Sequence, residues 1–151
     1  MPIHDDGGHR SLFFAAGAFD VVAIAASAGG LNALGLVLSG LPELFPAAVL
    51  FVQHLDPRQP SFMADILRRR TALQVKEAEE GERPKLGTVF IAPPNRHLLV
   101  NPDATIALTQ TELVHFVRPS ADLLFESVAF VMKPFSTGEI AEKIRAALKK
   151  P

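Results

Sequence analysis

The sequence predicts an α/β fold in which helices cover both faces of a mostly parallel sheet. Residues 20–27 (DVVAIAAS) and 47–54 (AAVLFVQH) are short apolar runs, typical of strands buried on both faces. Between them, residues 31–41 (LNALGLVLSGL) place leucine and valine at helical spacing. A strand, a helix and a strand with short connections imply parallel strands and a right-handed crossover.

The rest of the chain alternates between strands and helices. We expect a helix, a strand, a hairpin, a helix, a closing strand and a last helix, in that order: 61–70, 88–94, 97–109, 120–129, 130–133 and 137–150. The hairpin turns at Asn101-Pro102-Asp103, and residues 76–85 (KEAEEGERPK) form a surface loop. The predicted fold class is therefore doubly wound α/β, a three-layer flavodoxin-like or Rossmann-like arrangement with an inserted β-hairpin.

The composition indicates a single globular domain at residues 20–150, preceded by a disordered or loosely packed leader at 1–19. The net charge of −1 gives no electrostatic reason to expect nucleic acid or an anionic membrane. No apolar run is long enough to span a bilayer, so we expect a cytoplasmic protein without membrane insertion. The absence of cysteine excludes thiol chemistry, and the five histidines lack metal-ligand spacing. We expect no cofactor and no metal.

Ser27 and His54 are the candidate catalytic pair. Each ends one of the first two predicted strands, and ligands of open parallel sheets bind at the carboxyl ends of the strands. If the two strands are neighbours, the imidazole can take the proton from the serine hydroxyl, as a serine nucleophile requires. The backbone amide of Ala28, at the start of the next helix, is placed to stabilise an oxyanion.

Simpler interpretations of the same residues stay open. Ser27 is a favoured type of residue for a helix N-cap, and a strand–SAGG–helix turn also suits a phosphate or nucleotide. His54 alone fits an ordinary hydrogen-bonding residue at a strand end. The turn is also not a full G-x-S-x-G elbow, because Ala25 occupies the first glycine position.

Five longer blocks strongly resemble the catalytic domain of bacterial chemotaxis protein-glutamate methylesterases: VVAIAASAGGLNAL, FPAAVLFVQHL, TALQVKEAEEGE, GTVFIAPPNRHLLV and FVRPSADLLFESVA. The resemblance covers about residues 20–129. It implies a hydrolase that removes glutamate γ-methyl esters from the cytoplasmic helices of methylated chemoreceptors and deamidates glutamines there. It also implies a Ser-His-Asp triad in which Ser27 is the nucleophile and His54 the general base, with the Ala28 amide in the oxyanion hole.

The resemblance changes after residue 129. The family continues with a Gly-rich loop that carries the triad aspartate, and no such loop follows here. Residues 130–150 instead resemble the last strand and helix of a response-regulator receiver domain, with Lys133 and Pro134 at the matching positions and a cis bond between them in that family. We therefore expect an engineered or rearranged chimera with an incomplete triad and little or no activity. The alternative is a non-catalytic structural chimera of two α/β folds.

Overall fold

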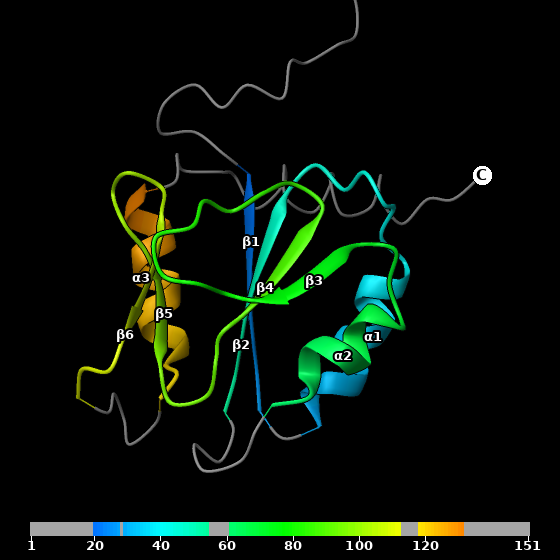
Figure 1. Ribbon diagram of the computed structural model, residues 1–151, viewed down its shortest axis with the longest axis horizontal. Helices are drawn as coiled ribbons and strands as arrows, with labels where there is room; N and C mark the ends of the chain where they lie inside the picture. Colours follow the sequence, from blue (N-terminus) through cyan, green and yellow to red (C-terminus); the bar gives the residue numbers. More distant parts are fainter. Residues whose placement is uncertain (1–19, 28, 55–60, 113–117, 132–151) are drawn as a thin grey trace, which may run out of the picture.

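The centre of the fold is a sheet of four parallel strands (Figure 1). The computed structural model describes residues 20–27, 29–54, 61–112 and 118–131, with side chains as far as residue 128. In spatial order the strands are β1 (Val21–Ala26), β2 (Ala48–Gln53), β4 (Thr88–Ile91) and β3 (Gln74–Glu77). Because all four run in the same direction, they end at the same side of the sheet, which we call the carboxyl edge.

Helices and a hairpin cover the two faces of this sheet. One face carries α1 (Gly30–Ser39) and α2 (Met63–Arg68), on the right in Figure 1. The other face carries α3 (Ala121–Val131) and an antiparallel hairpin of β5 (His97–Val100) and β6 (Ile106–Thr109), on the left. The result is three layers, because a sheet that is apolar on both faces needs a cover on each.

Alternating side chains of β2 build the two halves of the core. Val49 and Phe51 pack with α1 and α2, whereas Leu50 and Val52 pack with α3 and the hairpin. All four are at most 1% exposed. Burying a side chain of this size contributes roughly 1.5–3 kcal/mol, so the continuous apolar run of β2 fixes it as a central strand.

The predicted doubly wound class and the inserted hairpin are confirmed. The hairpin turns where the sequence predicts. The backbone amide of Asn101 donates to the Thr105 carbonyl at 2.8 Å, and the Asp103 carboxylate accepts from the backbone amide of Thr105 at 3.0 Å. An aspartate that binds the amide two residues later is a turn-forming arrangement, which explains why this turn was visible in the sequence.

Strand β3 was missed, and the surface loop predicted from residue 76 was wrong at its start. Gln74–Glu77 pairs in parallel with β4, and of its four residues only Val75 is buried. A four-residue strand with one buried side chain gives almost no periodic signal. Its strand conformation follows from backbone hydrogen bonds to β4, which the local sequence does not encode.

The prediction of a closing strand at 130–133 was also wrong for its first two residues. Phe130 and Val131 belong to α3, which runs to Val131. A short apolar run does not distinguish a buried strand from the end of a helix. Lys133-Pro134 lies outside the described residues, as do the leader at 1–19 and the helix predicted at 137–150. Within the described residues, the cis peptide bond is between Arg118 and Pro119.

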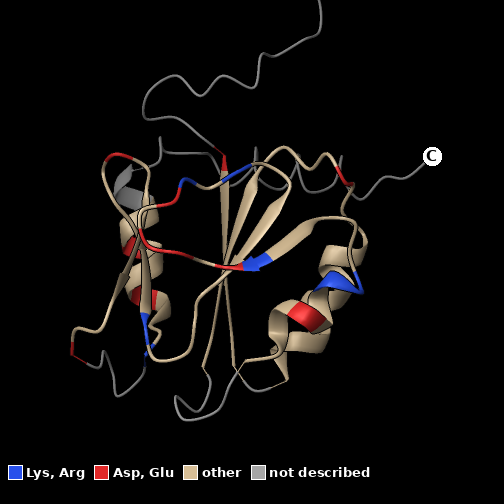
Figure 2. Ribbon diagram, viewed as in Figure 1, with Lys and Arg blue, Asp and Glu red and all other residues tan. Residues whose placement is uncertain are grey.

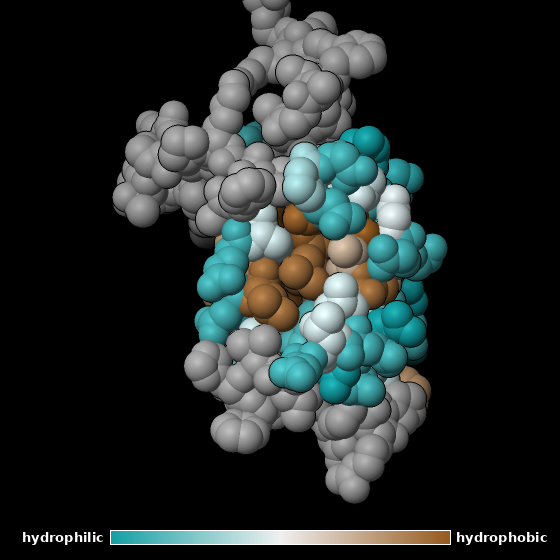
Figure 3. All heavy atoms as spheres, turned by 90° about the vertical axis from the view of Figure 1, so that its left-hand side faces the viewer, coloured by the Kyte–Doolittle hydropathy of each residue, from teal (hydrophilic) through white to brown (hydrophobic). Residues whose placement is uncertain are grey.

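Some apolar surface stays exposed beside α3. Figure 3 views the side formed by α3 and the hairpin, and apolar side chains group at its centre among polar ones. Leu124 is fully buried on the sheet, while Phe125 is 43% exposed. The helix is thus apolar on more than its sheet-facing side. Among the described residues, no helix combines the length and apolar character needed to cross a membrane.

Candidate active site

Strands β1 and β2 bring the candidate pair to the same edge of the sheet. They pair in parallel with Ala26 opposite Gln53, so Ser27 and His54 are the first residues beyond the last pair of each strand. The ladder continues one step further, because the His54 amide donates to the Ala26 carbonyl at 3.3 Å. Both strands end at the bottom of Figure 1, at the carboxyl edge. The predicted adjacency of the two strand ends is confirmed.

Two glycines shape the turn from β1 into α1. Gly29 has a φ of 86°, a left-handed conformation that a side chain disfavours. A Cβ added to Gly30 would lie 2.2 Å from the Cβ of Ala26, so the first residue of α1 packs directly on the end of β1. The turn is closed by the Gly30 amide, which donates to the Ser27 carbonyl at 3.0 Å. Glycine is therefore required at both positions for separate reasons.

The hydroxyl of Ser27 does not cap α1. The N-cap residue is Gly29, and no side chain makes a capping hydrogen bond there, so the N-cap interpretation of Ser27 is wrong. Ser27 and His54 are both exposed, and in the described part of the chain no hydrogen bond joins their side chains. Catalytic hydrogen bonds often form only once substrate is bound, so this geometry is compatible with a serine–histidine pair. Ala28, the predicted oxyanion donor, lies outside the described residues.

A buried histidine that was not assigned a role lies at the same edge. His97 is 0% exposed and begins β5, after the loop that leaves the carboxyl end of β4. Its Nδ1 accepts a hydrogen bond from the Ser120 amide at 3.1 Å, and its Nε2 lies 3.0 Å from the Glu112 carbonyl. Because the amide can only donate, Nδ1 must be the acceptor, and the proton on Nε2 then donates to Glu112. The ring is held as one neutral tautomer.

Two further polar groups lie at this edge, of which Gln53 was missed and Arg118, in the FVRPS block, was assigned no catalytic step. The Gln53 Oε1 and Arg118 Nε atoms are buried without a hydrogen-bond partner among the described residues. Gln53 is the polar end of an otherwise apolar strand and precedes His54, which is the signal that would have drawn attention to it. Such groups are uncommon in folded proteins and each needs an explanation. Within the described ranges, no three His, Asp or Glu side chains gather in a way that would hold a metal ion.

Comparison with known proteins agrees with this architecture. Residues 22–138 match the family described as CheB methylesterase. A protein of Leptospira interrogans named putative protein-glutamate methylesterase/protein-glutamine glutaminase is 39% identical over 122 residues, covering 81% of this chain and 63% of the relative. The Pseudomonas syringae pv. tomato protein-glutamate methylesterase/protein-glutamine glutaminase 3 is 44% identical over 108 residues, covering 72% and 32%. This chain thus spans less than two thirds of the length of these curated relatives.

A solved structure extends the likeness to three dimensions. The Thermotoga maritima CheB methylesterase catalytic domain superimposes with a TM-score of 0.71 at 29% sequence identity, covering 87% of this chain and 77% of that one. The family match begins at the second residue of β1 and includes Ser27, His54, the whole of β2 and the whole of α3. On the strength of sequence and structure together, this chain belongs to the CheB methylesterase family.

Proposed function

We propose that the carboxyl edge of this chain is a serine hydrolase site of the protein-glutamate methylesterase type. The observation that carries the proposal is the register of β1 and β2. The last paired residues are Ala26 and Gln53, so Ser27 directly follows β1 and His54 directly follows β2 at the same edge of the sheet. The proposed substrates are glutamate γ-methyl esters, and glutamine amides, in the cytoplasmic helices of chemoreceptors. The names of the relatives support this choice, since they combine methylesterase and glutaminase.

In the proposed reaction, the Ser27 hydroxyl attacks the ester carbonyl carbon while His54 accepts its proton. The carbonyl oxygen becomes an oxyanion, to which the Ala28 backbone amide donates. His54 then returns the proton to the departing methoxy group, so methanol leaves and an acyl-Ser27 ester remains. Water attacks this ester with His54 again as base, which yields glutamate and free Ser27.

We further propose that turnover is slow, because the sequence lacks the Gly-rich loop that carries the triad aspartate in the family it resembles. Asp20 lies at the opposite end of β1 from Ser27, where its carbonyl accepts from the Ala48 amide at 2.9 Å. Asp122 and Glu126 lie on α3. Disabling the aspartate of a serine protease triad costs about 10⁴-fold in kcat, and losing one oxyanion donor costs about 10²–10³-fold.

The experiment is a methanol-release assay on a synthetic peptide that contains a glutamate γ-methyl ester. We expect slow release by the parent chain and release at the uncatalysed rate by Ser27→Ala and His54→Ala. Ser39→Ala is the matched control, since Ser39 ends α1 and its hydroxyl binds the Leu36 carbonyl within the helix. Equal rates for the parent and Ser27→Ala would refute the proposal.

A second candidate is a non-catalytic structural chimera in which the receiver-like segment predicted at 130–150 completes the sheet with residues beyond the end of α3 at Val131. One observation favours it: α3 runs back from the carboxyl edge to the start of the strands and packs against β1 (Figure 1). The chain therefore leaves α3 where a further parallel strand beside β1 would begin, with the right-handed crossover that such connections take. A chain ending at residue 131 is expected to unfold at lower urea concentration; unchanged unfolding contradicts this candidate.

A further inference from the structure

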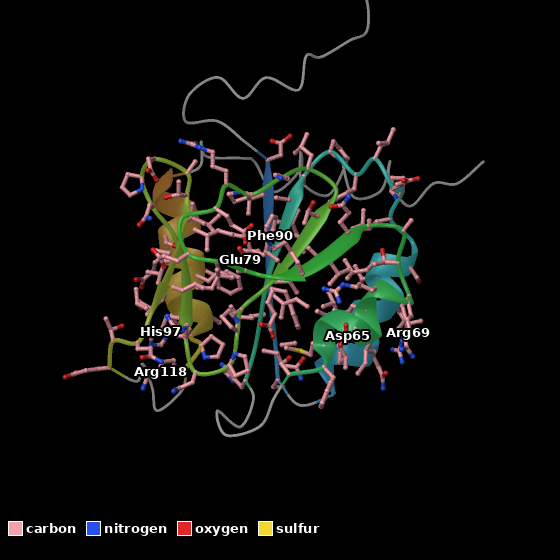
Figure 4. The ribbon with its side chains drawn as sticks, in the orientation of Figure 1. Asp65, Arg69, Glu79, Phe90, His97 and Arg118 are labelled. Carbon is pink, nitrogen blue, oxygen red and sulfur yellow. The ribbon has the colours of Figure 1, made fainter. Side chains whose placement is uncertain are left out.

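Two arginines flank the contact between His97 and Ser120. Arg96 directly precedes His97, and Arg118 lies two residues before Ser120. Since the His97 ring binds the Ser120 amide at 3.1 Å, the backbones that carry the two arginines are tied to each other. Figure 4 labels His97 and Arg118, which lie together at the lower left, toward the edge where β1 and β2 end. Figure 2 shows basic residues at the lower end of β5.

The guanidinium of Arg118 is only partly satisfied. It is half-buried, and one terminal nitrogen, Nη1, donates to the Gln110 carbonyl at 2.9 Å. Its Nε is buried with no hydrogen-bond partner among the described residues. Because the Nε is buried, a ligand would meet the terminal nitrogens of the half-exposed guanidinium. Burying part of a charged group without a full set of partners is costly, so the guanidinium favours an anionic partner there.

Arg96 offers a second positive charge at the same edge. It is exposed, and it follows Asn95, whose φ of 60° turns the loop after β4. The ion pairs seen among the described residues involve other basic side chains: Arg68 with Asp65, and Lys76 with two glutamates. The acidic residues closest in sequence are Glu112, whose carbonyl binds His97, and Asp122 in the first turn of α3.

We propose that Arg118 and Arg96 form a carboxylate-binding subsite beside Ser27, which recognises an acidic residue next to the modified glutamate in the protein substrate. This proposal rests on the proposed function. A guanidinium binds a carboxylate through two parallel hydrogen bonds, which lysine cannot reproduce. The subsite lies on the same edge as Ser27 because the loops that carry it leave β4 and enter α3, and α3 packs on β1. The ligand class is an acidic peptide.

The test is peptide binding to the full chain carrying Ser27→Ala, so that nothing is hydrolysed. One fluorescent synthetic peptide has a central glutamine flanked by glutamates, and its partner has glutamines in their place. Fluorescence anisotropy is expected to give a Kd about tenfold lower for the acidic peptide than for its partner. A difference of about tenfold in Kd is what one hydrogen bond between charged groups is expected to contribute. Raising the ionic strength to about 1 M, where the Debye length falls to about 3 Å, is expected to remove the difference.

Variants assign the effect to the two arginines. Arg118→Gln is expected to abolish the preference for the acidic peptide, and Arg118→Lys to restore only part of it. Arg96→Gln changes an exposed side chain, so it tests the subsite even if Arg118→Gln fails to fold. Arg69→Gln, an exposed arginine at the end of α2, is the control and keeps the preference.

The proposal is overturned if neither peptide binds, if both bind equally, or if Arg69→Gln weakens binding as much as Arg96→Gln. Since hydrolysis plays no part in this measurement, its failure is distinct from failure of the methylesterase proposal. A chain that binds the acidic peptide but never releases methanol would contradict only the latter.

Discussion

The Nδ1 atom of His97 accepts a hydrogen bond from the backbone amide of Ser120 at 3.1 Å, although 23 residues separate them in sequence. The Nε2 of the same ring binds the Glu112 carbonyl at 3.0 Å. One buried imidazole thus joins the start of the hairpin, the beginning of the segment after the hairpin and the residue before α3. This contact fixes one side of the carboxyl edge on which Ser27 and His54 lie.

Replacing His97 with phenylalanine is expected to destabilise the fold by about 3 kcal/mol. The change leaves the Ser120 amide and the Glu112 carbonyl buried without partners, and each such group costs about 1–3 kcal/mol. His97→Asn keeps an acceptor close to the position of Nδ1, so we expect a smaller loss. Urea unfolding followed by circular dichroism measures both.

His54 provides the matched control for His97. It is exposed and has no role in the core, so His54→Ala is expected to change the free energy of unfolding by less than about 0.5 kcal/mol. We therefore expect substitution of His97 to lower stability, and substitution of His54 to affect only hydrolysis. If His97→Phe unfolds at the same urea concentration as the parent chain, the buried contact does not stabilise the fold.

Gly30→Ala is expected to destabilise the chain by about 1–3 kcal/mol through overpacking. The added Cβ would lie 2.2 Å from the Cβ of Ala26, so α1 must move away from the end of β1. Ala26→Gly in the same chain removes the clashing atom and should recover part of the loss. Thermal unfolding of the two single variants and the double variant gives the coupling energy.

Gly35→Ala is the control for that experiment. A Cβ at Gly35 would approach only the flexible side chain of Arg70, with its Cδ at 3.0 Å. Alanine also favours helix over glycine by about 1 kcal/mol in a helix interior. We expect Gly35→Ala to be neutral or mildly stabilising. A similar loss for Gly30→Ala and Gly35→Ala would mean that contact with Ala26 is not the cause.

The hairpin turn is expected to lose stability in acid because of Asp103. The hydroxyl and amide of Thr105 both donate to its carboxylate, and they hold the pKa of Asp103 below its ordinary value of 3.8. A lowered pKa in the folded state means that the contribution is present above pH 3.8 and is lost as the pH falls through the folded value.

Titration followed by NMR measures this shift directly. We expect the Asp103 carboxyl to titrate below 3.8 in the parent chain and closer to 3.8 in Thr105→Val, which lacks the hydroxyl. The stability difference between the parent and Asp103→Asn is expected to shrink at low pH. An Asp103 midpoint at or above its ordinary value contradicts this account of the turn.

The sequence alone was enough to predict the parts of the fold that depend on local pattern. The apolar runs of β1 and β2 and the helical spacing between them predicted parallel strands, and parallel strands place Ser27 and His54 at one edge. The hairpin turn was predictable for the same reason, because Asp103 binds a neighbouring residue.

The missed features depend on partners far apart in the sequence. His97 gave no signal of burial, since its two partners lie 15 and 23 residues away. Strand β3 is a strand because β4 lies beside it, and the apolar end of α3 looked like the strand predicted at 130–133. For His97 and β3, tertiary contacts rather than the local pattern decide the conformation, whereas the short apolar run at the end of α3 fits a helix and a buried strand equally well.

Covalent trapping of Ser27 tests the central claim most directly. Incubation with a fluorophosphonate, followed by peptide mapping with mass spectrometry, reports whether this hydroxyl is activated and by which residue. We expect phosphonylation at Ser27 in the parent chain, none in Ser27→Ala, and labelling slowed at least about 100-fold in His54→Ala, since a positioned general base contributes about 10²–10⁴-fold. Labelling of Ser27 at an unchanged rate in His54→Ala would show that the two strand ends do not act together.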